Sequence, residues 1–316
     1  MTTPRVAALI VTWNSAPHVA EAIRSVPEGV PVVVVDNGSV DGSAEVAREA
    51  GARVIEAGTN LGFGPACNLG AEASAPSETV LFLNPDAALV DGRSCVEALL
   101  AALDGDRTVA AAAPALTGDG QERFQLRKLP TFGSLAREAL LVNRLFPESA
   151  GLRSERYLDR PRDAPFDVEQ PAGAALLVRR DVFEELGGFD VAFAPAWFED
   201  VDLCARIRSS GRRLRFVPSA RATHAGGTAM KALPYRDFLP LYTRNLFLYL
   251  RKHEGAGARI AARSVLCLGT LLRLALLPFV RGDHARGDAA AAYARVLGGL
   301  LGFGWKSALL PSERRS

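Results

Sequence analysis

The chain has 316 residues, of which 48% are hydrophobic and 23% charged, a balance typical of a globular protein and not of a disordered one. Its four cysteines lack the close spacing of a zinc site or disulfide framework, which fits a reducing compartment. The first apolar run, residues 6–11, is too short for a signal peptide, so we expect the chain to start in the cytoplasm.

The net charge of +2 is unevenly distributed along the chain. Residues 244–316 carry 12 basic and 4 acidic side chains, a net charge of +8, whereas the residues before them carry a net charge of −6. Such a basic segment indicates a membrane surface or a nucleic acid as partner, or it is an ordinary basic helical tail. Charge alone leaves these three alternatives open.

Strand and helix patterns alternate along the first part of the chain. Apolar, β-branched runs predict strands at 5–13, within 30–43, at 52–58 and at 79–86, and helical patterns lie between them at 15–26, 43–51 and 64–74. This alternation predicts βαβ units and a doubly wound, mostly parallel sheet with flanking helices. Because ligands bind beyond the carboxyl ends of such strands, the polar residues there are candidates for a site.

The second half of the chain is less regular. Residues 105–165 predict long loops around a helix at 134–145, and a helix at 198–211 precedes a strand at 213–227. Two apolar stretches, 264–280 and 289–305, are each interrupted by an arginine and are short for a membrane span. We expect these stretches to be helices lying in a membrane interface. The alternative is a helical hairpin packed on the rest of the chain or in a dimer.

Three segments together carry a family resemblance. They are "VTWNS…VVVVDNGSVDGS", "NLGFGPACNLG…LFLNPDA" and "AGAALLVRR…GGFD…FEDVDLCARIRSSG". In this order they resemble the family 2 glycosyltransferases of GT-A fold, and among these the bacterial rhamnosyltransferase-like branch. The resemblance covers about residues 5–230. It implies a GT-A catalytic domain at 1–232, with a nucleotide-sugar half at about 1–105 and an acceptor half at about 106–232, followed by a helical, membrane-associating region at 233–316.

The resemblance implies a donor site at the ends of the first two strands. Asp36 ends the second strand, and its carboxylate can accept a hydrogen bond from the imide N–H of uracil or thymine. By resemblance, Asp36 contacts the nucleobase and ribose of a nucleotide sugar. Glycines in the neighbouring loop would let the backbone approach the nucleotide closely. The other residues assigned here to nucleotide-sugar binding are Thr12, Trp13, Asn14, Asn37, Gly38, Gly62, Phe63 and Asn68.

The tripeptide "NPD" stands where the family usually carries an Asp-x-Asp motif. Asn84 replaces the first acid, and we assign both Asn84 and Asp86 to the donor site. Asp86 is the expected ligand of Mg²⁺ or Mn²⁺, ions that take few carboxylates and complete their shell with phosphate oxygens and water. His224 is the expected second ligand or a phosphate contact. The ion would neutralise charge on the departing nucleoside diphosphate.

The segment "WFEDVD" supplies the expected proton acceptor. Glu199 and Asp200 are adjacent at a helix start and point about 100° apart around its axis. The resemblance assigns the second acid, Asp200, as the general base that deprotonates the acceptor hydroxyl, while Glu199 could orient the acceptor or Asp200. For acceptor binding we expect an apolar platform from Trp197 and Phe198 and a close backbone approach at Gly173.

The expected function is therefore an inverting glycosyltransferase, with L-rhamnose from dTDP-rhamnose as the donor that the resemblance favours. The expected acceptor is a polyprenyl-diphosphate-linked or cell-surface glycan, reached from the inner face of the cell membrane. Other donors (UDP-GlcNAc, UDP-galactose or GDP-mannose), a homodimer, and a scaffold without catalysis are the alternatives. A dehydrogenase or P-loop enzyme is excluded because G-x-G-x-x-G and GxxxxGK[ST] are absent. The tail lacks an RNA-binding pattern, so we expect no nucleic-acid partner.

Overall fold

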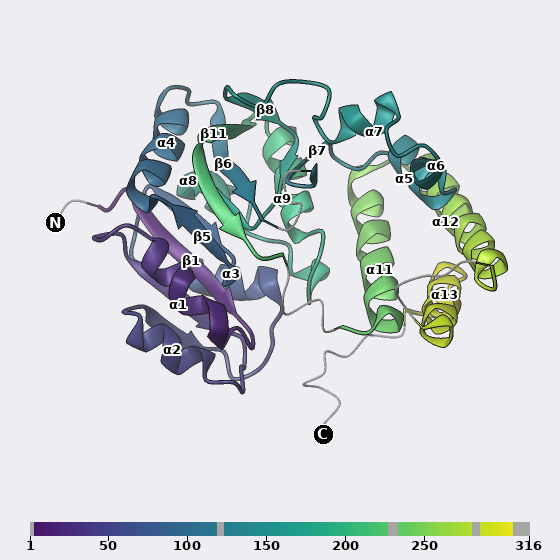
Figure 1. Ribbon diagram of the computed structural model, residues 1–316, viewed down its shortest axis with the longest axis horizontal. Coiled ribbons are helices and arrows are strands. Elements are labelled where there is room, and N and C mark those ends of the chain that lie inside the picture. The colour runs from purple at the N-terminus through teal and green to yellow at the C-terminus, as the bar shows by residue number, and fades with distance from the viewer. Residues whose placement is uncertain (1–2, 119–122, 227–232, 280–284, 306–316) are drawn as a thin grey trace. The chain divides into compact units, whose positions relative to one another are not determined.

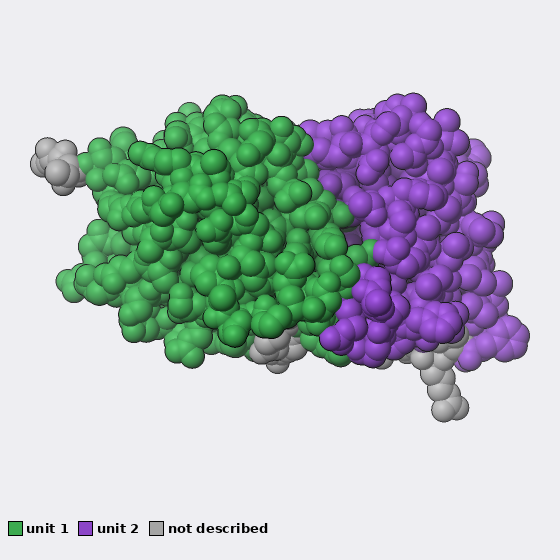
Figure 2. All heavy atoms as spheres, turned by 90° about the horizontal axis from the view of Figure 1, so that it is seen from above, with its two compact units in different colours: residues 1–129, 154–229 green, residues 130–153, 230–316 purple. Residues whose placement is uncertain are grey.

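The computed structural model describes residues 3–118, 123–226, 233–279 and 285–305 (Figure 1). The chain forms two compact units, coloured separately in Figure 2. Unit 1 comprises Met1–Leu129 and Ser154–Ala229, and unit 2 comprises Pro130–Arg153 and Met230–Ser316. The boundary expected at residue 232 lies outside the described residues. Residues 130–153 group with the C-terminal helices, an assignment that the sequence analysis did not make.

Unit 1 is built on a nine-stranded sheet with the order β3–β2–β1–β4–β10–β6–β11–β5 and with β8 paired to β11. A separate two-stranded ribbon pairs β7 with β9. The strands are β1 (Val6–Thr12), β2 (Val32–Asp36), β3 (Arg53–Glu56), β4 (Thr79–Leu83), β5 (Ala87–Val90), β6 (Val109–Thr117), β7 (Leu126–Arg127), β8 (Phe166–Val168), β9 (Gln170–Pro171), β10 (Ala175–Arg179) and β11 (Arg213–His224).

The sheet is mixed, and the expectation of a mostly parallel sheet holds for its first half and for the parallel pair β6 and β11. Strands β3, β2, β1 and β4 run parallel, as their βαβ pattern predicts. Strand β10 runs antiparallel to both β4 and β6, and β11 runs antiparallel to β5 and β8. The reason is that the chain leaves the sheet after β6 and re-enters it between two existing strands in the opposite direction.

Helices cover both faces of this sheet, which confirms the expected α/β fold. Side chains of α1 (Ala16–Ser25), α2 (Ser43–Glu49) and α4 (Gly92–Asp104) share one buried apolar cluster with Ala8 and Ile10 of β1. Side chains of α3 (Phe63–Ala73), α8 (Arg180–Glu185) and α9 (Glu199–Ser209) share a second cluster with Leu9 and Val11. This alternation along one strand is the period-2 pattern of a strand buried on both faces.

Unit 2 is helical within its described residues. Its helices are α5 (Phe132–Ala139), α6 (Val142–Leu145), α11 (Tyr235–His253), α12 (Ala256–Leu276) and α13 (Arg286–Leu300), and α7 (Ala150–Glu155) crosses its boundary with unit 1. The helix expected at 134–145 is two helices, because Leu141 adopts a left-handed conformation with φ of 62°. Among the helices that the structure describes, none has the length and apolar character needed to cross a membrane.

Polar contacts explain the arginines that interrupt the apolar helices. Arg273 of α12 donates hydrogen bonds to the carbonyl oxygens of Glu138 (2.7 Å) and Ala139, at the C-terminus of α5. Arg295 of α13 forms a 2.7 Å ion pair with Asp237 of α11, whose side chain is only 3% exposed. These arginines therefore join helices of unit 2 to each other, and each has a partner inside the unit.

The contact between α5 and α12 gives a stability test. A Cβ on Gly269 would overlap the backbone carbonyl oxygen of Ala139, whereas a Cβ on Gly257 of the same helix meets nothing within 4 Å. Alanine is favoured over glycine in a helix by up to about 1 kcal/mol. We expect Gly269→Ala to lower the free energy of unfolding by about 1–3 kcal/mol because the backbone must move apart. The matched variant Gly257→Ala should leave stability unchanged or raise it, as measured by chemical denaturation. Equal effects of the two substitutions would contradict this packing.

Candidate active site

Two buried polar side chains lie side by side where β1 and β2 end. Thr12 and Asp36 are partners in the parallel register, and neither is more than 4% exposed. The Asp36 Oδ2 atom accepts a hydrogen bond from the Ser39 amide (3.0 Å). Asp36 Oδ1 and Thr12 Oγ1 are buried without a hydrogen-bond partner among the described residues. Leaving such groups unpaired is costly, so this edge is suited to a ligand that supplies a donor to Asp36 and an acceptor or donor to Thr12.

Asn14 and Asn37 hold the loops around this pair. Asn14 has a φ of 51°, and its backbone N–H donates a hydrogen bond to Ser39 Oγ (3.0 Å). Its side-chain oxygen accepts a hydrogen bond from the backbone N–H of Val40 (2.9 Å). Asn37 accepts from the Leu61 amide (2.9 Å) and donates to Asn60 Oδ1 (3.0 Å). Both residues were assigned to nucleotide-sugar binding, and the structure shows that their side chains also bond to neighbouring loops.

Gly38 and Trp13 belong to the same loops. A Cβ on Gly38, which has φ of 74°, would come within 3.1 Å of the Thr59 backbone, so glycine is needed for the two loops to meet. Trp13 is partly exposed beside Thr12. Of the two, Trp13 therefore has the side chain that a ligand at this edge can contact.

The glycine-rich loop before α3 docks on the protein and not on open solvent. A Cβ on Gly62 would lie 2.7 Å from the carbonyl oxygen of Pro195, which also accepts a hydrogen bond from the Phe63 amide (2.9 Å). Asn68 exchanges two hydrogen bonds with the backbone of Phe189, both of 2.8 Å. The close approach predicted at Gly62 is thus between two protein segments. The Asn68 amide joins α3 to the turn before residue 190, a structural role that we had not predicted.

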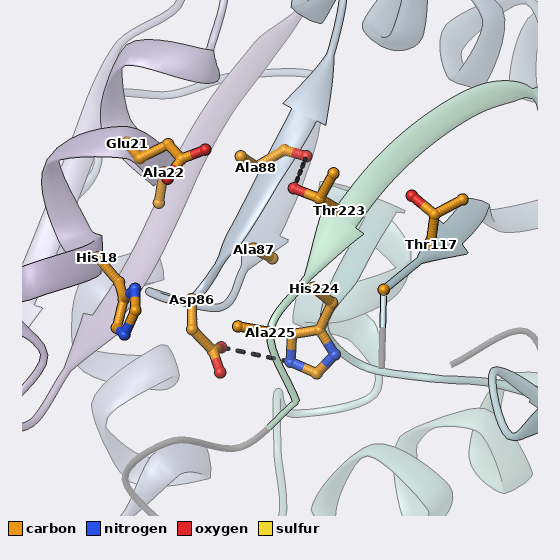
Figure 3. A pocket seen from close by; sticks show the side chains of 11 residues that line it. His18, Glu21, Ala22, Asp86, Ala87, Ala88, Thr117, Thr223, His224 and Ala225 are labelled. Carbon is orange, nitrogen blue, oxygen red and sulfur yellow. Dashed lines mark hydrogen bonds and ion pairs between the residues drawn. The ribbon is translucent and has the colours of Figure 1, made fainter. Parts of the chain in front are cut away.

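Asp86 and His224 meet at a cavity of about 400 Å³ (Figure 3). Asp86 Oδ1 lies 3.3 Å from His224 Nε2, and the two side chains are 5% and 11% exposed. The Asn84 side-chain nitrogen is 3.4 Å from the same imidazole nitrogen. The residues come together because Asp86 immediately precedes β5, and β5 pairs with the end of β11, where His224 stands opposite Ala87.

The opposite wall of this cavity is formed by residues that were not predicted as part of a site. His18 and Glu21 of α1 line it across from Asp86, as Figure 3 shows for His18. Their spacing of three residues puts them on one helical face, a signal that the sequence did contain. They were overlooked because α1 follows β1 directly and β4 lies about sixty residues later in the chain.

Asp86 and His224 fit a divalent cation as two of its ligands. Adjacent ligands in an octahedral shell with bonds of about 2.1 Å are about 3 Å apart, close to the 3.3 Å between Asp86 Oδ1 and His224 Nε2. No group of three or more His, Cys, Asp or Glu side chains that could hold a metal occurs among the described residues. The remaining ligands would have to come from water or from the phosphate oxygens of a nucleotide.

Two adjacent acids, Glu199 and Asp200, begin α9. Phe198 and Trp197, which precede it, both have positive φ (73° and 70°), a strained backbone that sets the direction of the first helical turn. Asp200 Oδ1 accepts a hydrogen bond from the Val201 amide (2.8 Å). A Cβ on Gly173 would lie 3.1 Å from Asp200 Oδ2, so the backbone of the loop after β9 lies against this carboxylate. Gly173 and Asp200, two residues that the sequence analysis assigned to the acceptor side, are thus neighbours in the structure.

The pKa values of these two buried acids are both raised, and that of Glu199 more than that of Asp200. Burial, and then the charge of Asp200, raises the pKa of Glu199 well above its ordinary value, and Glu199 Oε2 has no hydrogen-bond partner among the described residues. Burial also raises the pKa of Asp200, but the amides of Val201 and Gly173 and the charge of Arg127 act in the opposite direction. Of the two, Asp200 is therefore the acid that ionises more readily, and Glu199 the one held more strongly in its protonated form.

The two aromatic residues before these acids differ in their exposure to solvent. Trp197 is partly exposed, whereas Phe198 is only 5% exposed. Phe198 therefore belongs to the interior, because a buried ring cannot stack on a sugar, and this corrects the expectation of a two-residue platform. Trp197 keeps the exposure that such a platform requires.

An ion pair that the sequence analysis did not single out anchors α9. Arg206 contacts Asp202 at 2.7 Å and donates hydrogen bonds to the carbonyl oxygens of Leu186 and Gly188, both at 2.8 Å. The Asp202 side chain is fully buried. Their i, i+4 spacing was a readable signal. The pair fixes the helix that carries Asp200 to the same turn that Asn68 holds from the other side.

The raised pKa of Glu199 predicts that replacing its carboxyl group by an amide stabilises the protein, and more so at high pH. A group whose pKa is raised in the folded state contributes most to stability below its unfolded pKa, here 4.5, and loses this contribution as the pH rises through the folded pKa. Glu199→Gln removes the ionisation, so the variant should unfold at a higher temperature than the wild type at pH 8, with a smaller difference at pH 5. Asp200→Asn is the matched control: because the pKa of Asp200 is raised less, this variant should gain less stability at pH 8 than Glu199→Gln. A Glu199→Gln variant that is less stable than the wild type at pH 8 would contradict the assignment.

Comparisons with known proteins agree with this geometry. Residues 7–187 match the family model described as glycosyl transferase family 2. The N-acetylglucosaminyl-diphospho-decaprenol L-rhamnosyltransferase of Mycobacterium tuberculosis is 31% identical over 266 residues, covering 78% of this chain and 84% of that protein. The rhamnosyltransferase WbbL of Escherichia coli is 40% identical over 57 residues, covering 18% and 21% of the two chains.

Solved structures share the fold at lower identity. A mannosyltransferase of Pyrobaculum calidifontis, in complex with GDP-Man and Mn²⁺, has a TM-score of 0.56 at 19% identity and covers 99% of this chain and 83% of its own. Glucosyl-3-phosphoglycerate synthase of Mycobacterium tuberculosis, in complex with Mn²⁺ and UDP, has a TM-score of 0.51 at 17% identity, with coverage of 79% and 80%. The family match spans more than half of the chain and the mycobacterial relative most of it, so the protein belongs to glycosyl transferase family 2, as its motifs predicted.

Proposed function

We propose that this glycosyltransferase is an inverting, metal-dependent enzyme that transfers a hexose, with L-rhamnose from dTDP-rhamnose as first candidate, to a polyprenyl-diphosphate-linked glycan. The observation that carries the proposal is the unpaired, buried Asp36 carboxylate oxygen, in the same unit as the Asp86–His224 pair and Asp200. Rhamnose and a lipid-linked acceptor are taken from the name of the 31% identical relative.

In the proposed donor site, Asp36 recognises the base. Its Oδ1 atom would accept the imide N–H of thymine or uracil, and the Thr12 hydroxyl would bond to a neighbouring carbonyl of the same ring. Both groups are buried, so a mismatched base would leave them unpaired at a cost of about 1–3 kcal/mol each. This disfavours adenine and cytosine, which lack such an N–H, whereas guanine offers an N1–H beside its O6 carbonyl, so the donor panel must separate GDP-mannose from the dTDP and UDP sugars.

The diphosphate would lie at Asp86 and His224. A divalent ion bound there supplies positive charge for the departing nucleoside diphosphate. Asp86 and His224 would hold the ion, and Asn84 would bond to the donor or to the imidazole 3.4 Å away. Because the chain offers few ligands of its own, we expect metal and nucleotide to bind together.

Asp200 would act as the general base. As the acceptor oxygen forms a bond to the anomeric carbon, its proton passes to Asp200, and the electron pair of the breaking C–O bond leaves with the diphosphate. Attack on the face opposite the diphosphate inverts the anomeric configuration. Glu199, held more strongly in its protonated form, would position that carboxylate and would not exchange the proton itself.

Calorimetric titration of a donor panel tests this function. We expect dTDP-rhamnose to bind only with Mg²⁺ or Mn²⁺ present, and Asp86→Ala to lose that metal-dependent binding. Asp36→Asn should weaken dTDP binding about tenfold or more, because the carboxamide offers a weaker acceptor than the ionised acid. Metal-dependent binding of UDP-GlcNAc, UDP-galactose or GDP-mannose instead would replace rhamnose but keep the transferase. Absence of binding by every nucleotide would favour the scaffold alternative, for which Asn84 would be the reason.

We further propose that unit 2 attaches the enzyme to the inner face of the membrane through α12. Ile260, Leu268 and Leu271 of α12 are between 53% and 70% exposed, and their spacings of eight and three residues put them in one stripe. The C-terminal region that contains them carries a net charge of +8, which suits an anionic lipid surface. The competing arrangement is a homodimer that buries the same stripe.

Vesicle sedimentation tests the proposed attachment. We expect the wild type to pellet with phosphatidylglycerol vesicles at low salt, and Leu268→Glu with Leu271→Glu to abolish pelleting. Val40→Glu, at a hydrophobic position of unit 1 that is 91% exposed, is the matched control and should pellet like the wild type. A double variant that still pellets would contradict the role of the stripe. A dimer in solution that the same variant dissociates would favour the competing arrangement.

A further inference from the structure

A cationic surface lies close to the Asp200 carboxylate within unit 1. Arg127 belongs to β7, where it pairs with Gln170 of β9, and the chain from β9 reaches Gly173 and its contact with Asp200 three residues later. The paired strands are about 5 Å apart and three residues span at most about 10 Å, so the Arg127 backbone lies within about 15 Å of Gly173. The Ala172 amide also donates a 2.7 Å hydrogen bond to the carbonyl of Gln125, two residues before Arg127. The charge of Arg127 is also close enough to lower the pKa of Asp200.

A second arginine converges on the same place. The guanidinium carbons of Arg127 and Arg156 lie 5.9 and 4.7 Å from the centre of the Phe124 ring, which is 43% exposed. A backbone hydrogen bond from the Lys128 amide to the Glu155 carbonyl (2.8 Å) holds the segment of Arg156 beside β7. Two cations thus lie against one exposed ring, which places both guanidinium groups where an anionic ligand could reach them.

Arg127 is not neutralised by a carboxylate. It forms no ion pair with an acidic residue among those that the structure describes. Its Nε donates a 3.2 Å hydrogen bond to the Phe124 carbonyl. Its two terminal nitrogens therefore keep their capacity for the paired contacts that guanidinium groups make with phosphate.

We propose that Arg127 and Arg156 bind the diphosphate of the lipid-linked acceptor. This inference rests on the proposed function, in which the acceptor is a sugar joined to a polyprenol through a diphosphate. When that acceptor holds a single sugar, the attacking hydroxyl and the diphosphate belong to one ring. The groups that bind the diphosphate must then lie near the general base, and Arg127 is on the ribbon whose strand β9 leads into the loop that lies against Asp200. The diphosphate of the donor, in contrast, is assigned to Asp86 and His224.

The test measures binding of a short-chain acceptor analogue, N-acetylglucosaminyl-diphospho-farnesol, by calorimetry and without donor. We expect Arg127→Gln and Arg156→Gln each to weaken its binding about tenfold. Arg93→Gln removes one exposed positive charge from α4 of the same unit and should bind like the wild type. An alkyl N-acetylglucosaminide without the diphosphate should bind all four proteins equally and weakly.

Each outcome decides the inference separately from the proposed function. Equal affinity of the four proteins for the diphospho-glycolipid, or no binding by the wild type, would overturn it. If the arginine variants instead lost affinity for dTDP and Mn²⁺ while glycolipid binding was unchanged, the surface would belong to the donor and the inference would be wrong. Failure of the proposed function would show as absence of transfer from every donor, a result that leaves the glycolipid titration interpretable.

Discussion

The turn at residues 187–189 is held from both sides by α3 and α9. This double attachment fixes Asp200 of α9, the proposed general base, with respect to the proposed donor loops. Asn68 of α3 binds the backbone of Phe189 with two hydrogen bonds, and Arg206 of α9 binds the carbonyl of Gly188. Direct attack requires the acceptor oxygen and the anomeric carbon to meet within a small fraction of an ångström, which a loose connection could not ensure. The polar groups that make this connection are inside one unit and largely buried, where they resist exchange with water.

The site divides negative charge unequally between its two ends. At α9, burial and mutual repulsion favour the protonated form of Glu199 while amide donors and Arg127 support the charge on Asp200. At the end of β4, Asn84 replaces an acid, so only Asp86 carries charge beside His224. A second carboxylate there would strengthen metal binding in the absence of substrate. With one, an ion at the proposed site would be retained mainly when phosphate oxygens complete its shell, which would couple donor binding to assembly of the site.

The sequence was sufficient for the parallel half of the sheet and for the residues at its carboxyl edge. Continuous apolar runs that stop on Asp36 and on "NPD" determine strand ends locally, and a parallel arrangement brings such ends together. It was not sufficient for the direction of β10, because strand order depends on pairing across nearly a hundred residues. The protein contacts of Asn37 and Asn68 were not predicted for a related reason: an asparagine has the same local sequence pattern whether its amide binds a ligand or a distant backbone. Phe198 was misassigned because burial, which decides between core and platform, is a tertiary property.

Arg273 shows the same limit in the C-terminal region. From the sequence, a charge in the middle of an apolar stretch has no evident partner. The carbonyls that Arg273 binds at the end of α5 are 134 and 135 residues away in the chain, so only the folded structure reveals them. Helix C-termini carry partial negative charge, so an arginine is favourable there. The exposed apolar stripe of α12 lies on positions other than that of Arg273, so one helix can contribute both to the interior of unit 2 and to a lipid-facing surface.

Arg127 presents a problem that the proposed acceptor site resolves. A cation beside a general base favours the ionised carboxylate, but it also makes that carboxylate a weaker proton acceptor. If an acceptor diphosphate binds Arg127, its negative charge offsets the cation, and the proton affinity of Asp200 rises when the hydroxyl to be deprotonated arrives. Before the acceptor binds, the weaker base would be less able to activate water against the sugar donor. The same arginine would then select the acceptor and limit wasteful hydrolysis, through a single change in local charge.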